Sequence, residues 1–290
     1  FAVVNGPISV TFGPDDLAVF KAIAEQSAFA LFSEAVYLEA GEKRRLDSDL
    51  ETAREIQSIL LPAASPEIAG YEVSGLNIPA RHVSGDYFDY LRIDEHHWGL
   101  AIADVSGKGI PAALITSMCR SLLRAAAPGC TSAAEVMRAV NRRLYPDIKQ
   151  DMFVSMLYVV LDTRTNDVTL ARAGHDPPLL YRATDREVLP LRPPGMAVGI
   201  DSGSVFDKII AEETVTLASG DGILLYTDGA TEALDAHGSE FGLPRLVQAV
   251  QANASKGAAA TVSNIAAELR EFAGEFAQYD DITLISIRRL

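Results

Sequence analysis

Cysteine is scarce in this chain of 290 residues, which contains only Cys119 and Cys130. A disulfide-stapled secreted framework is therefore excluded, and we expect a reduced, cytoplasmic protein in which both thiols pack into the core. The sequence also lacks apolar runs of the roughly 18–20 residues that a membrane span needs, and it has no signal-peptide pattern at its start. These absences predict a chain without a membrane-spanning segment.

Positive charge is also in short supply: 25 lysines and arginines stand against 39 aspartates and glutamates, for a formal net charge of -14. Nucleic acids and anionic membranes are bound by clustered cations that neutralise phosphate, and the cations here are scattered. We therefore expect neither a nucleic-acid nor a membrane partner. With 48% hydrophobic residues, the composition is that of a globular protein with one large domain and a smaller piece.

The sequence starts at Phe1, and we expect it to be a fragment of a longer protein. Residues 1–13 contain two short β-like pieces that could not bury two faces alone, so we interpret them as the remnant of a preceding domain. A segment rich in proline and small residues, 62–70, has the composition of a turn and marks a domain boundary. We place the large domain at residues 68–290.

A long helix is predicted for residues 14–61, beginning at a proline that suits the first turn and ending before Pro62. Leucine or alanine recurs every seven residues along it and, after a one-residue slip near Gly41, the pattern resumes: the positions are Leu17, Ala24, Leu31, Leu38, Leu46, Ala53 and Leu60. A single helix of this length needs a partner along its apolar stripe. We favour a parallel homodimer seam, because the other faces are polar; the alternative is a helix packed on its own domain.

In the large domain the pattern alternates groups of strands with pairs of helices. Strands are predicted at 71–78, 86–93, 98–103, 152–161, 168–171, 178–182, 215–217, 222–227 and 281–287, and helices at 111–127, 133–145, 243–252 and 258–276. Because strict β-α-β alternation is missing, we expect an α+β fold with two mainly antiparallel sheets packed together and helix pairs outside. The nearly continuous apolar run 152–161 predicts a central strand buried on both faces.

Four places put aspartate at the end of a predicted strand. Asp86 opens one strand and Asp104 closes the next, and a symmetric register of this hairpin would place the two opposite each other. Asp228 closes the strand 222–227, and Asp280 with Asp281 opens the last one. Antiparallel neighbours bring the end of one strand beside the beginning of the next, which allows Asp228 and Asp280 to be neighbours.

Carboxylates packed this closely cannot all stay ionised without a cation, and an oxygen-only ligand set suits Mg or Mn better than Zn. Two ions that share a carboxylate would activate a bridging water and clamp a phosphoryl group, which is the design of a hydrolase. The alternative is that strand-end aspartates only cap turns. Three of the four positions lie beside glycine, which favours the metal site.

For two other polar residues, a structural or solvent-exposed role is favoured over a catalytic one. His175 could be a general acid, but nothing in the sequence places it beside the carboxylates, so we expect it to hold its loop. Arg81, five residues before Asp86, could reach a phosphate, but a solvated arginine is the favoured interpretation.

Several of these residues belong to motifs that resemble a known series: Ser84-Gly-Asp-Tyr-Phe-Asp, Asp104-Val-Ser-Gly-Lys-Gly-Ile-Pro-Ala-Ala-Leu, Ala173-Gly-His-Asp-Pro-Pro-Leu-Leu, Leu224-Leu-Tyr-Thr-Asp-Gly-Ala-Thr-Glu-Ala and Asp280-Asp-Ile-Thr-Leu. Together they are similar to the motifs of metal-dependent PPM-type serine/threonine phosphatases, in the branch of the SpoIIE and RsbU regulators. The resemblance runs from about Ala53 to the C-terminus. It implies an α-β-β-α sandwich, two Mn or Mg ions, and dephosphorylation of phosphoserine or phosphothreonine on a partner protein.

The resemblance also implies a partner and a ligand set. The usual substrate of that branch is a small STAS-type anti-sigma-factor antagonist, in sigma-factor regulation and stress response. Asp104 would bridge both ions, Asp86 and the Val105 carbonyl would complete one site, and Asp228 and Asp280 the other. The choice of Asp280 over Asp281 is the least secure of these assignments. One departure is Ser84, where the family more often has glycine.

The first stretch resembles a second family. Phe12-Gly-Pro-Asp-Asp-Leu-Ala-Val-Phe, continuing to Leu31, is similar to the last helix of a GAF sensor domain, which implies that residues 14–61 link a sensor to the phosphatase. The alternative function is a weakly active or inactive switch or scaffold with the phosphatase fold, which binds a signalling partner and responds to the long helix.

Overall fold

The computed structural model describes residues 13–290, so the predicted β-like remnant lies outside the described residues except for Gly13. The chain divides into two compact units, residues 1–52 and residues 53–290. Helix α1 (Pro14–Leu60) begins in the first unit and ends in the second, just before Pro62, as its sequence predicts. Within the described residues, every helix is too short or too polar to cross a bilayer.

The unit 53–290 contains the two sheets and their helices. Its strands are β1 (Tyr71–Ile78), β2 (Asp86–Arg92), β3 (His97–Val105), β4 (Val154–Asp162), β5 (Asp167–Ala173), β6 (Leu179–Tyr181), β7 (Val188–Pro190), β8 (Glu212–Thr216), β9 (Gly222–Tyr226) and β10 (Ile282–Arg289). Its helices after α1 are α2 (Ile110–Ala126), α3 (Ala133–Leu144), α4 (Phe206–Ile209), α5 (Gly242–Asn253) and α6 (Ala258–Ala273), with 3-10 turns η1 (Asp228–Ala230) and η2 (Ala254–Lys256).

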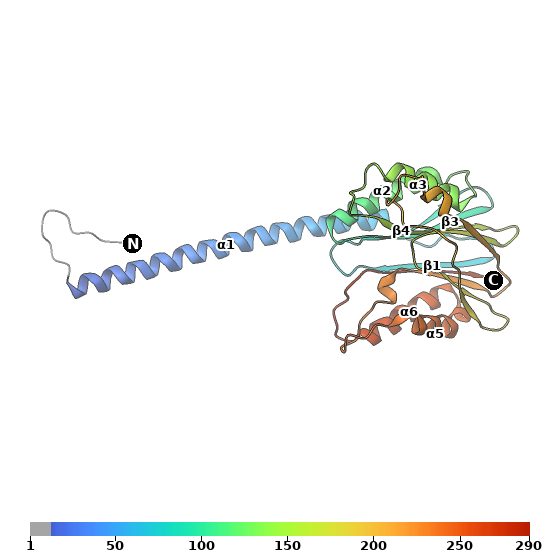
Figure 1. Ribbon diagram of the computed structural model, residues 1–290. Helices are drawn as coiled ribbons and strands as arrows, with labels where there is room; N and C mark the ends of the chain where they lie inside the picture. Colours follow the sequence, from blue (N-terminus) through green and yellow to red (C-terminus); the bar gives the residue numbers. More distant parts are fainter. Residues whose placement is uncertain (1–12) are drawn as a thin grey trace. The chain divides into compact units, whose positions relative to one another are not determined.

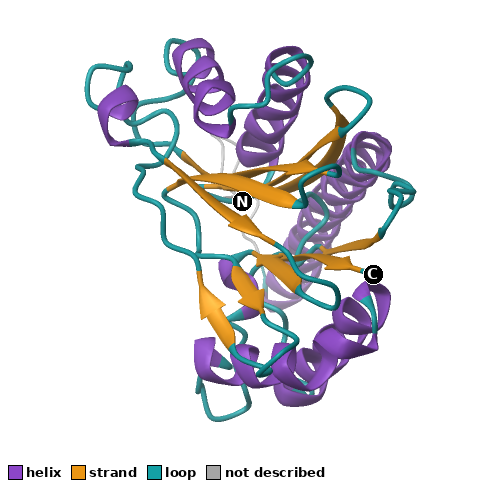
Figure 2. Cartoon of the chain, turned by 90° about the vertical axis from the view of Figure 1, so that its right-hand side faces the viewer, coloured by secondary structure: helices purple, strands orange, loops and turns teal. Residues whose placement is uncertain are grey.

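The strands form two five-stranded sheets, in the orders β1-β10-β9-β6-β7 and β2-β3-β4-β5-β8. All the strand pairs in both sheets are antiparallel. Figures 1 and 2 show the two sheets face to face, with α2 and α3 outside one and α5 and α6 outside the other. The predicted α-β-β-α sandwich is therefore confirmed.

Three apolar layers hold the sandwich together. Between the sheets, side chains such as Phe88, Leu157, Ile223 and Ile285 are buried in one cluster. A second cluster joins β2 to β5 with α2 and α3, and a third joins β6, β9 and β10 with α5 and α6. β4 contributes to two of these layers, which explains why its sequence is apolar on both faces, as predicted for a central strand.

Neither β7 nor α4 was predicted, because they contain three and four residues, too few to carry a periodic pattern. The topology also departs from a simple meander after β5. β6 crosses to the other sheet, where it pairs with β7 and β9, and the C-terminal β10 inserts between β1 and β9.

The predicted seam of α1 behaves differently in its two parts. In the first unit, Leu17, Leu31 and Leu38 are each at least 65% exposed. In the second unit, Ala53 and Leu60 line a shallow groove against α2. The last two turns of the helix therefore pack on their own domain, which was the alternative interpretation, while the earlier turns expose their apolar side chains.

A buried ion pair fastens α2 to β2. Asp89 is fully buried and accepts two hydrogen bonds from the guanidinium of Arg124, at 2.7 and 2.8 Å, and a third from the Tyr87 hydroxyl. Replacing Arg124 with alanine would leave a buried carboxylate without its cation.

We expect Arg124→Ala to lower the free energy of unfolding by about 3 kcal/mol, measured by urea denaturation. Arg124 is partly exposed, which keeps the loss at the lower end of the range for such pairs. Lys149→Ala removes the cation of an exposed pair with Asp151 and should change stability by less than about 0.5 kcal/mol. Equal losses in the two variants would contradict the role assigned to the buried pair.

Candidate functional site

The hairpin of β2 and β3 brings the first two aspartates together. Asp86 lies directly opposite Asp104 in the register, which confirms the prediction from hairpin symmetry. The chain then continues through Val105, whose N–H donates to the carbonyl of Gly85, just before the neighbouring strand begins. The Val105 carbonyl and the two carboxylates are thus placed at one end of this sheet.

The other sheet delivers Asp228 and Asp280 to the same place. β9 and β10 pair antiparallel, so the end of β9, followed by Asp228, lies beside the start of β10, preceded by Asp280. Thr227 and Thr283, one from each strand, both donate through their hydroxyls to Asp86 Oδ2, at 2.8 and 2.5 Å. These two hydrogen bonds join the two sheets through Asp86, a member of the acidic cluster.

The carboxylates raise one another's pKa. Burial, followed by the charges of Asp228 and Asp280, raises the pKa of Asp104 to about 7. Burial and the nearby charge of Asp104 raise the pKa of Asp86 well above its usual value. Burial, with Glu232 and Asp280, raises the pKa of Asp228 to about 6. Such a cluster of oxygen donors fits a hard divalent cation, because a positive charge would relieve the repulsion.

Asp281 has a different environment from its neighbour Asp280. Its Oδ1 accepts from the Ala80 N–H at 2.7 Å, and its Oδ2 accepts from the Ser84 hydroxyl and the Gly85 N–H, at 2.8 and 2.7 Å. Both oxygens therefore hold the loop before β2. This arrangement favours Asp280 over Asp281 as a metal ligand.

A lysine lies against Asp280. Lys108 Nζ is 2.7 Å from Asp280 Oδ2, donates to the carbonyl of Tyr279 at 2.9 Å, and lies 3.9 Å from the centre of the Tyr279 ring. Gly107 and Gly109 on either side both have positive φ, so the tight turn that presents Lys108 needs glycine at these positions. Lys108 thus partly neutralises the acidic cluster.

The aspartate side chains of the cluster do not yet converge on one metal position. Among residues 13–290, no three histidine, cysteine or acidic side chains already converge at metal-ligand spacing. The partners described above account for this, since Asp86 Oδ2 accepts from two threonines and Asp280 pairs with Lys108. Binding of a metal ion would require Asp280 to exchange its lysine for the ion.

Gly85 leaves room for the Val105 carbonyl. A Cβ built on Gly85 would lie 3.3 Å from the Val105 oxygen and 3.5 Å from Asp104 Oδ1. The φ of Gly85 is not positive, so alanine can adopt this backbone. Its methyl group would instead press against the Val105 oxygen, a proposed metal ligand, while the distance to Asp104 is that of an ordinary contact.

We expect Gly85→Ala to weaken Mn²⁺ binding about tenfold or more, measured by calorimetry, because ligand distances must hold within about 0.2 Å. Gly41→Ala is the matched control, since a Cβ there meets no atom within 4 Å and φ is again not positive. An unchanged dissociation constant in Gly85→Ala would show that the Val105 carbonyl is not a ligand.

Several residues that support the cluster were not singled out from the sequence. Gln57 makes two hydrogen bonds with the backbone of Ser84, accepting from its N–H at 2.8 Å and donating to its carbonyl at 2.7 Å. Thr116 donates to the Gly85 carbonyl at 2.8 Å. Ser84 itself has no positive φ, and its hydroxyl bonds Asp281 and the Asp86 N–H, which explains how serine replaces the expected glycine.

His175 is buried and connects strands of the two sheets. It is 3% exposed, and its ring nitrogens contact the Ser155 hydroxyl at 2.8 Å and the Tyr226 carbonyl at 3.1 Å. Burial lowers its pKa to about 4. His175 therefore links β4 to β9, as expected for a residue that fixes the loop. Arg81 is exposed, as predicted, beside the cleft that contains Asp104.

Comparisons with known proteins identify the family of the chain. The family model for stage II sporulation protein E (SpoIIE) matches residues 94–290. Phosphoserine phosphatase RsbU of Bacillus subtilis (strain 168) is 30% identical over 249 residues, covering 86% of this chain and 72% of RsbU. Phosphoserine phosphatase RsbP of the same organism is 28% identical over 191 residues, covering 63% of this chain and 45% of RsbP, so less than half of RsbP is spanned.

A solved structure shares the fold over most of the chain. The SiaA-PP2C domain of Pseudomonas aeruginosa has a TM-score of 0.74 and 25% sequence identity, covering 85% of this chain and 98% of that domain. The resemblance drawn from the five motifs is confirmed by the family model, the RsbU match and the shared fold. The chain therefore belongs to the SpoIIE family of PP2C-type protein phosphatases.

Proposed function

We propose that the chain hydrolyses phosphoserine or phosphothreonine on a partner protein with the help of two Mg²⁺ or Mn²⁺ ions. The observation that carries this proposal is the gathering of Asp86, Asp104, Asp228 and Asp280 from four strand ends, with raised pKa values at the first three. These four side chains provide only carboxylate oxygens as ligands, which suits Mg²⁺ or Mn²⁺.

Each residue has a distinct part in this proposal. Asp104 would contact both ions, Asp86 and the Val105 carbonyl would hold one, and Asp228 and Asp280 the other. When bound, the ions supply a water of lowered pKa and positive charge for the phosphoryl group. Thr227 and Thr283 orient Asp86, while Asp281 holds the Ser84-Gly85 backbone so that the hairpin keeps its place.

The proposal is tested by measuring release of phosphate from p-nitrophenyl phosphate and from a phosphoserine STAS-type protein. STAS-type anti-sigma-factor antagonists are the substrate class that we propose, on the resemblance to the SpoIIE and RsbU branch. Turnover should need Mg²⁺ or Mn²⁺ and should stop when EDTA is added. Turnover at an equal rate without divalent ions would rule out the mechanism.

We further propose that residues 14–61 are the linker from a GAF-like sensor and form a parallel dimer seam. Support comes from the exposed apolar side chains of the first unit, including Leu17, Leu31 and Leu38. The end of the helix reaches the site through Gln57, which holds the Ser84 backbone next to Gly85. Movement of this helix would therefore act on the loop that precedes Asp86.

Removal of residues 1–52 tests the seam, because the contacts of Gln57 remain. We expect the full chain to sediment as a dimer and the shortened one as a monomer in analytical ultracentrifugation. The same oligomeric state in both would contradict the seam.

The Lys108–Asp280 ion pair favours one second candidate, a weakly active switch that binds a signalling partner until the helix activates it. In that case the full chain should bind the phosphoprotein yet release phosphate slowly at saturating Mn²⁺. Fast turnover by the full chain would exclude this candidate.

A further inference from the structure

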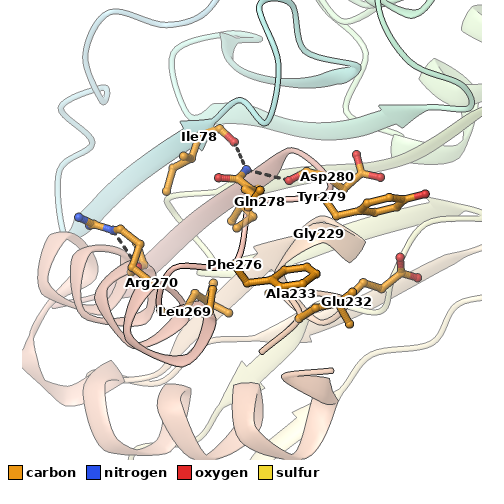
Figure 3. Close-up of a pocket in the computed structure, with 16 residues that line it drawn as sticks. Ile78, Gly229, Glu232, Ala233, Leu269, Arg270, Phe276, Gln278, Tyr279 and Asp280 are labelled. Carbon is orange, nitrogen blue, oxygen red and sulfur yellow. Dashed lines mark hydrogen bonds between the residues drawn. The ribbon is translucent and has the colours of Figure 1, made fainter. Parts of the chain in front are cut away.

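A cavity of about 250 Å³ lies beside the acidic cluster, between the end of α6, the turn after β9 and the loop that precedes β10. Figure 3 shows the side chains that line it. Most of its wall is apolar: Ile78, Ala233, Ala266, Leu269, Phe276 and Ile282. It is thus an apolar space in a surface whose neighbouring site is strongly acidic.

The cavity adjoins the proposed metal site. Asp280 and Gly229, which directly follows Asp228, form part of its wall. Glu232 also lines it, and its charge is close enough to raise the pKa of Asp228. In Figure 3 the carboxylates of Glu232 and Asp280 lie on the same side of the cavity as Tyr279. A group bound in the cavity would therefore be a near neighbour of a phosphoryl group at the aspartates.

The wall formed by residues 274–280 is fastened in place. Gln278 donates to the carbonyls of Ile78 and Asp280, at 2.8 and 2.7 Å, and so joins this loop to β1. On the same loop, Phe276 is 43% and Tyr279 is 65% exposed. Exposed aromatic side chains next to a preformed apolar hollow are typical of surfaces that bind another protein.

The volume of the cavity limits what can fill it. Pockets for small-molecule ligands usually measure about 300–1,000 Å³, whereas a single apolar side chain needs less. We propose that this cavity binds one apolar side chain, such as that of leucine, that lies close to the phosphoserine in the sequence or fold of the protein substrate. This inference rests on the proposed function, since it takes the phosphoserine to be bound at Asp104 and Asp228.

Synthetic phosphoserine peptides test the inference. The set differs only in one leucine, moved through the positions on either side of the phosphoserine, with a parent peptide that has serine instead. For at least one position, we expect kcat/KM with Mn²⁺ to exceed that of the parent about tenfold or more, the amount that burial of a leucine side chain supplies. Equal values at all positions would overturn the inference.

Two variants then locate the preference. Ala273→Leu fills part of the cavity from the last turn of α6, and Phe276→Ala removes part of its wall at a partly exposed position. In both variants, kcat/KM for the leucine peptide should exceed that for the parent peptide by about twofold or less. Ala260→Leu, in the first turn of the same helix and away from this cavity, should retain the full ratio. An undiminished ratio in both cavity variants would place the leucine elsewhere.

Failure of the proposed function has a different signature. If p-nitrophenyl phosphate and every peptide resist hydrolysis with Mn²⁺, the phosphatase proposal fails and the inference fails with it. If all are hydrolysed without preference for leucine, only the inference about the cavity is overturned.

Discussion

Replacing Asp104 with asparagine should reduce hydrolysis of p-nitrophenyl phosphate by roughly 10³-fold or more, because loss of even one contact that stabilises a transition state costs about 10²–10³-fold. Asp104 faces Asp86 across the hairpin and lies close enough to Asp228 and Asp280 for their charges to raise its pKa. It is therefore the carboxylate placed to serve both proposed ions. An amide in its place keeps the shape but loses the negative charge that binds the metal.

The assay should be paired with calorimetric titration of Mn²⁺. Asp104→Asn should bind Mn²⁺ more weakly and at fewer sites than the parent protein. Asp151→Asn serves as the control, since Asp151 is exposed and pairs only with Lys149 on the surface. Full activity of Asp104→Asn would refute the two-metal mechanism, and so would an equal loss in Asp151→Asn.

Local sequence signals were enough to predict half of this site. The short turn between β2 and β3 restricts the hairpin to few registers, so Asp86 and Asp104 could be paired from their spacing alone. Likewise, the apolar run of β4 allowed only a strand buried on both faces. In both cases the determining contacts lie within a few residues or within a single strand.

The other half depends on contacts between distant segments. Asp228 and Asp280 come together because β10 pairs with β9 on one edge and β1 on the other, with Asn77 opposite Thr283. Antiparallel pairing permitted this arrangement, but the sequence does not state which strands will be neighbours across such a separation. The same holds for the crossing of β6 into the second sheet.

Side-chain partners were the hardest to foresee. Lys108 pairs with Asp280, and Gln57 with the Ser84 backbone, each across a long stretch of chain. A lysine between two glycines and a glutamine on a helix have many possible partners, so their types carry little information. The chemistry of the four aspartates could be predicted because like charges that meet require a cation whatever surrounds them.

That repulsion leads to the second large effect, on stability. In metal-free protein at pH 8, Asp104→Asn should melt about 5 °C higher than the parent, by differential scanning calorimetry, since about 1 kcal/mol corresponds to 2–4 °C in a domain of this size. Asparagine removes one charge from a buried acidic cluster that includes Asp86 and Asp228.

The difference should depend on pH with a defined sign. The pKa of Asp104 is raised from 3.8 to about 7 in the folded protein. Its proton therefore favours the folded state fully below about pH 4, and this contribution is lost as the pH rises through 7. The advantage of Asp104→Asn should accordingly be absent below about pH 4, be partial at pH 5 and reach its full size by pH 8.

His175 acts in the opposite direction over the same range. Its pKa is lowered to about 4, so its contribution is present above about pH 6.5 and is lost as the pH falls toward 4. This effect is common to both proteins, and it cancels when Asp104→Asn is compared with the parent at each pH. The comparison thus isolates Asp104, which a pH scan of the parent alone would not.

Manganese should raise the melting temperature of the parent protein above that of Asp104→Asn. At pH 8 and a concentration near 100 times its dissociation constant, an ion that binds only the folded state stabilises it by about 2.7 kcal/mol. The parent gains this and Asp104→Asn gains less, because its bridging carboxylate is gone. Two results would contradict this account. In one, the parent melts at a higher temperature than Asp104→Asn without metal; in the other, Mn²⁺ does not raise the melting temperature of the parent above that of Asp104→Asn. Either result would show that the four aspartates do not repel one another in the metal-free protein or do not bind Mn²⁺.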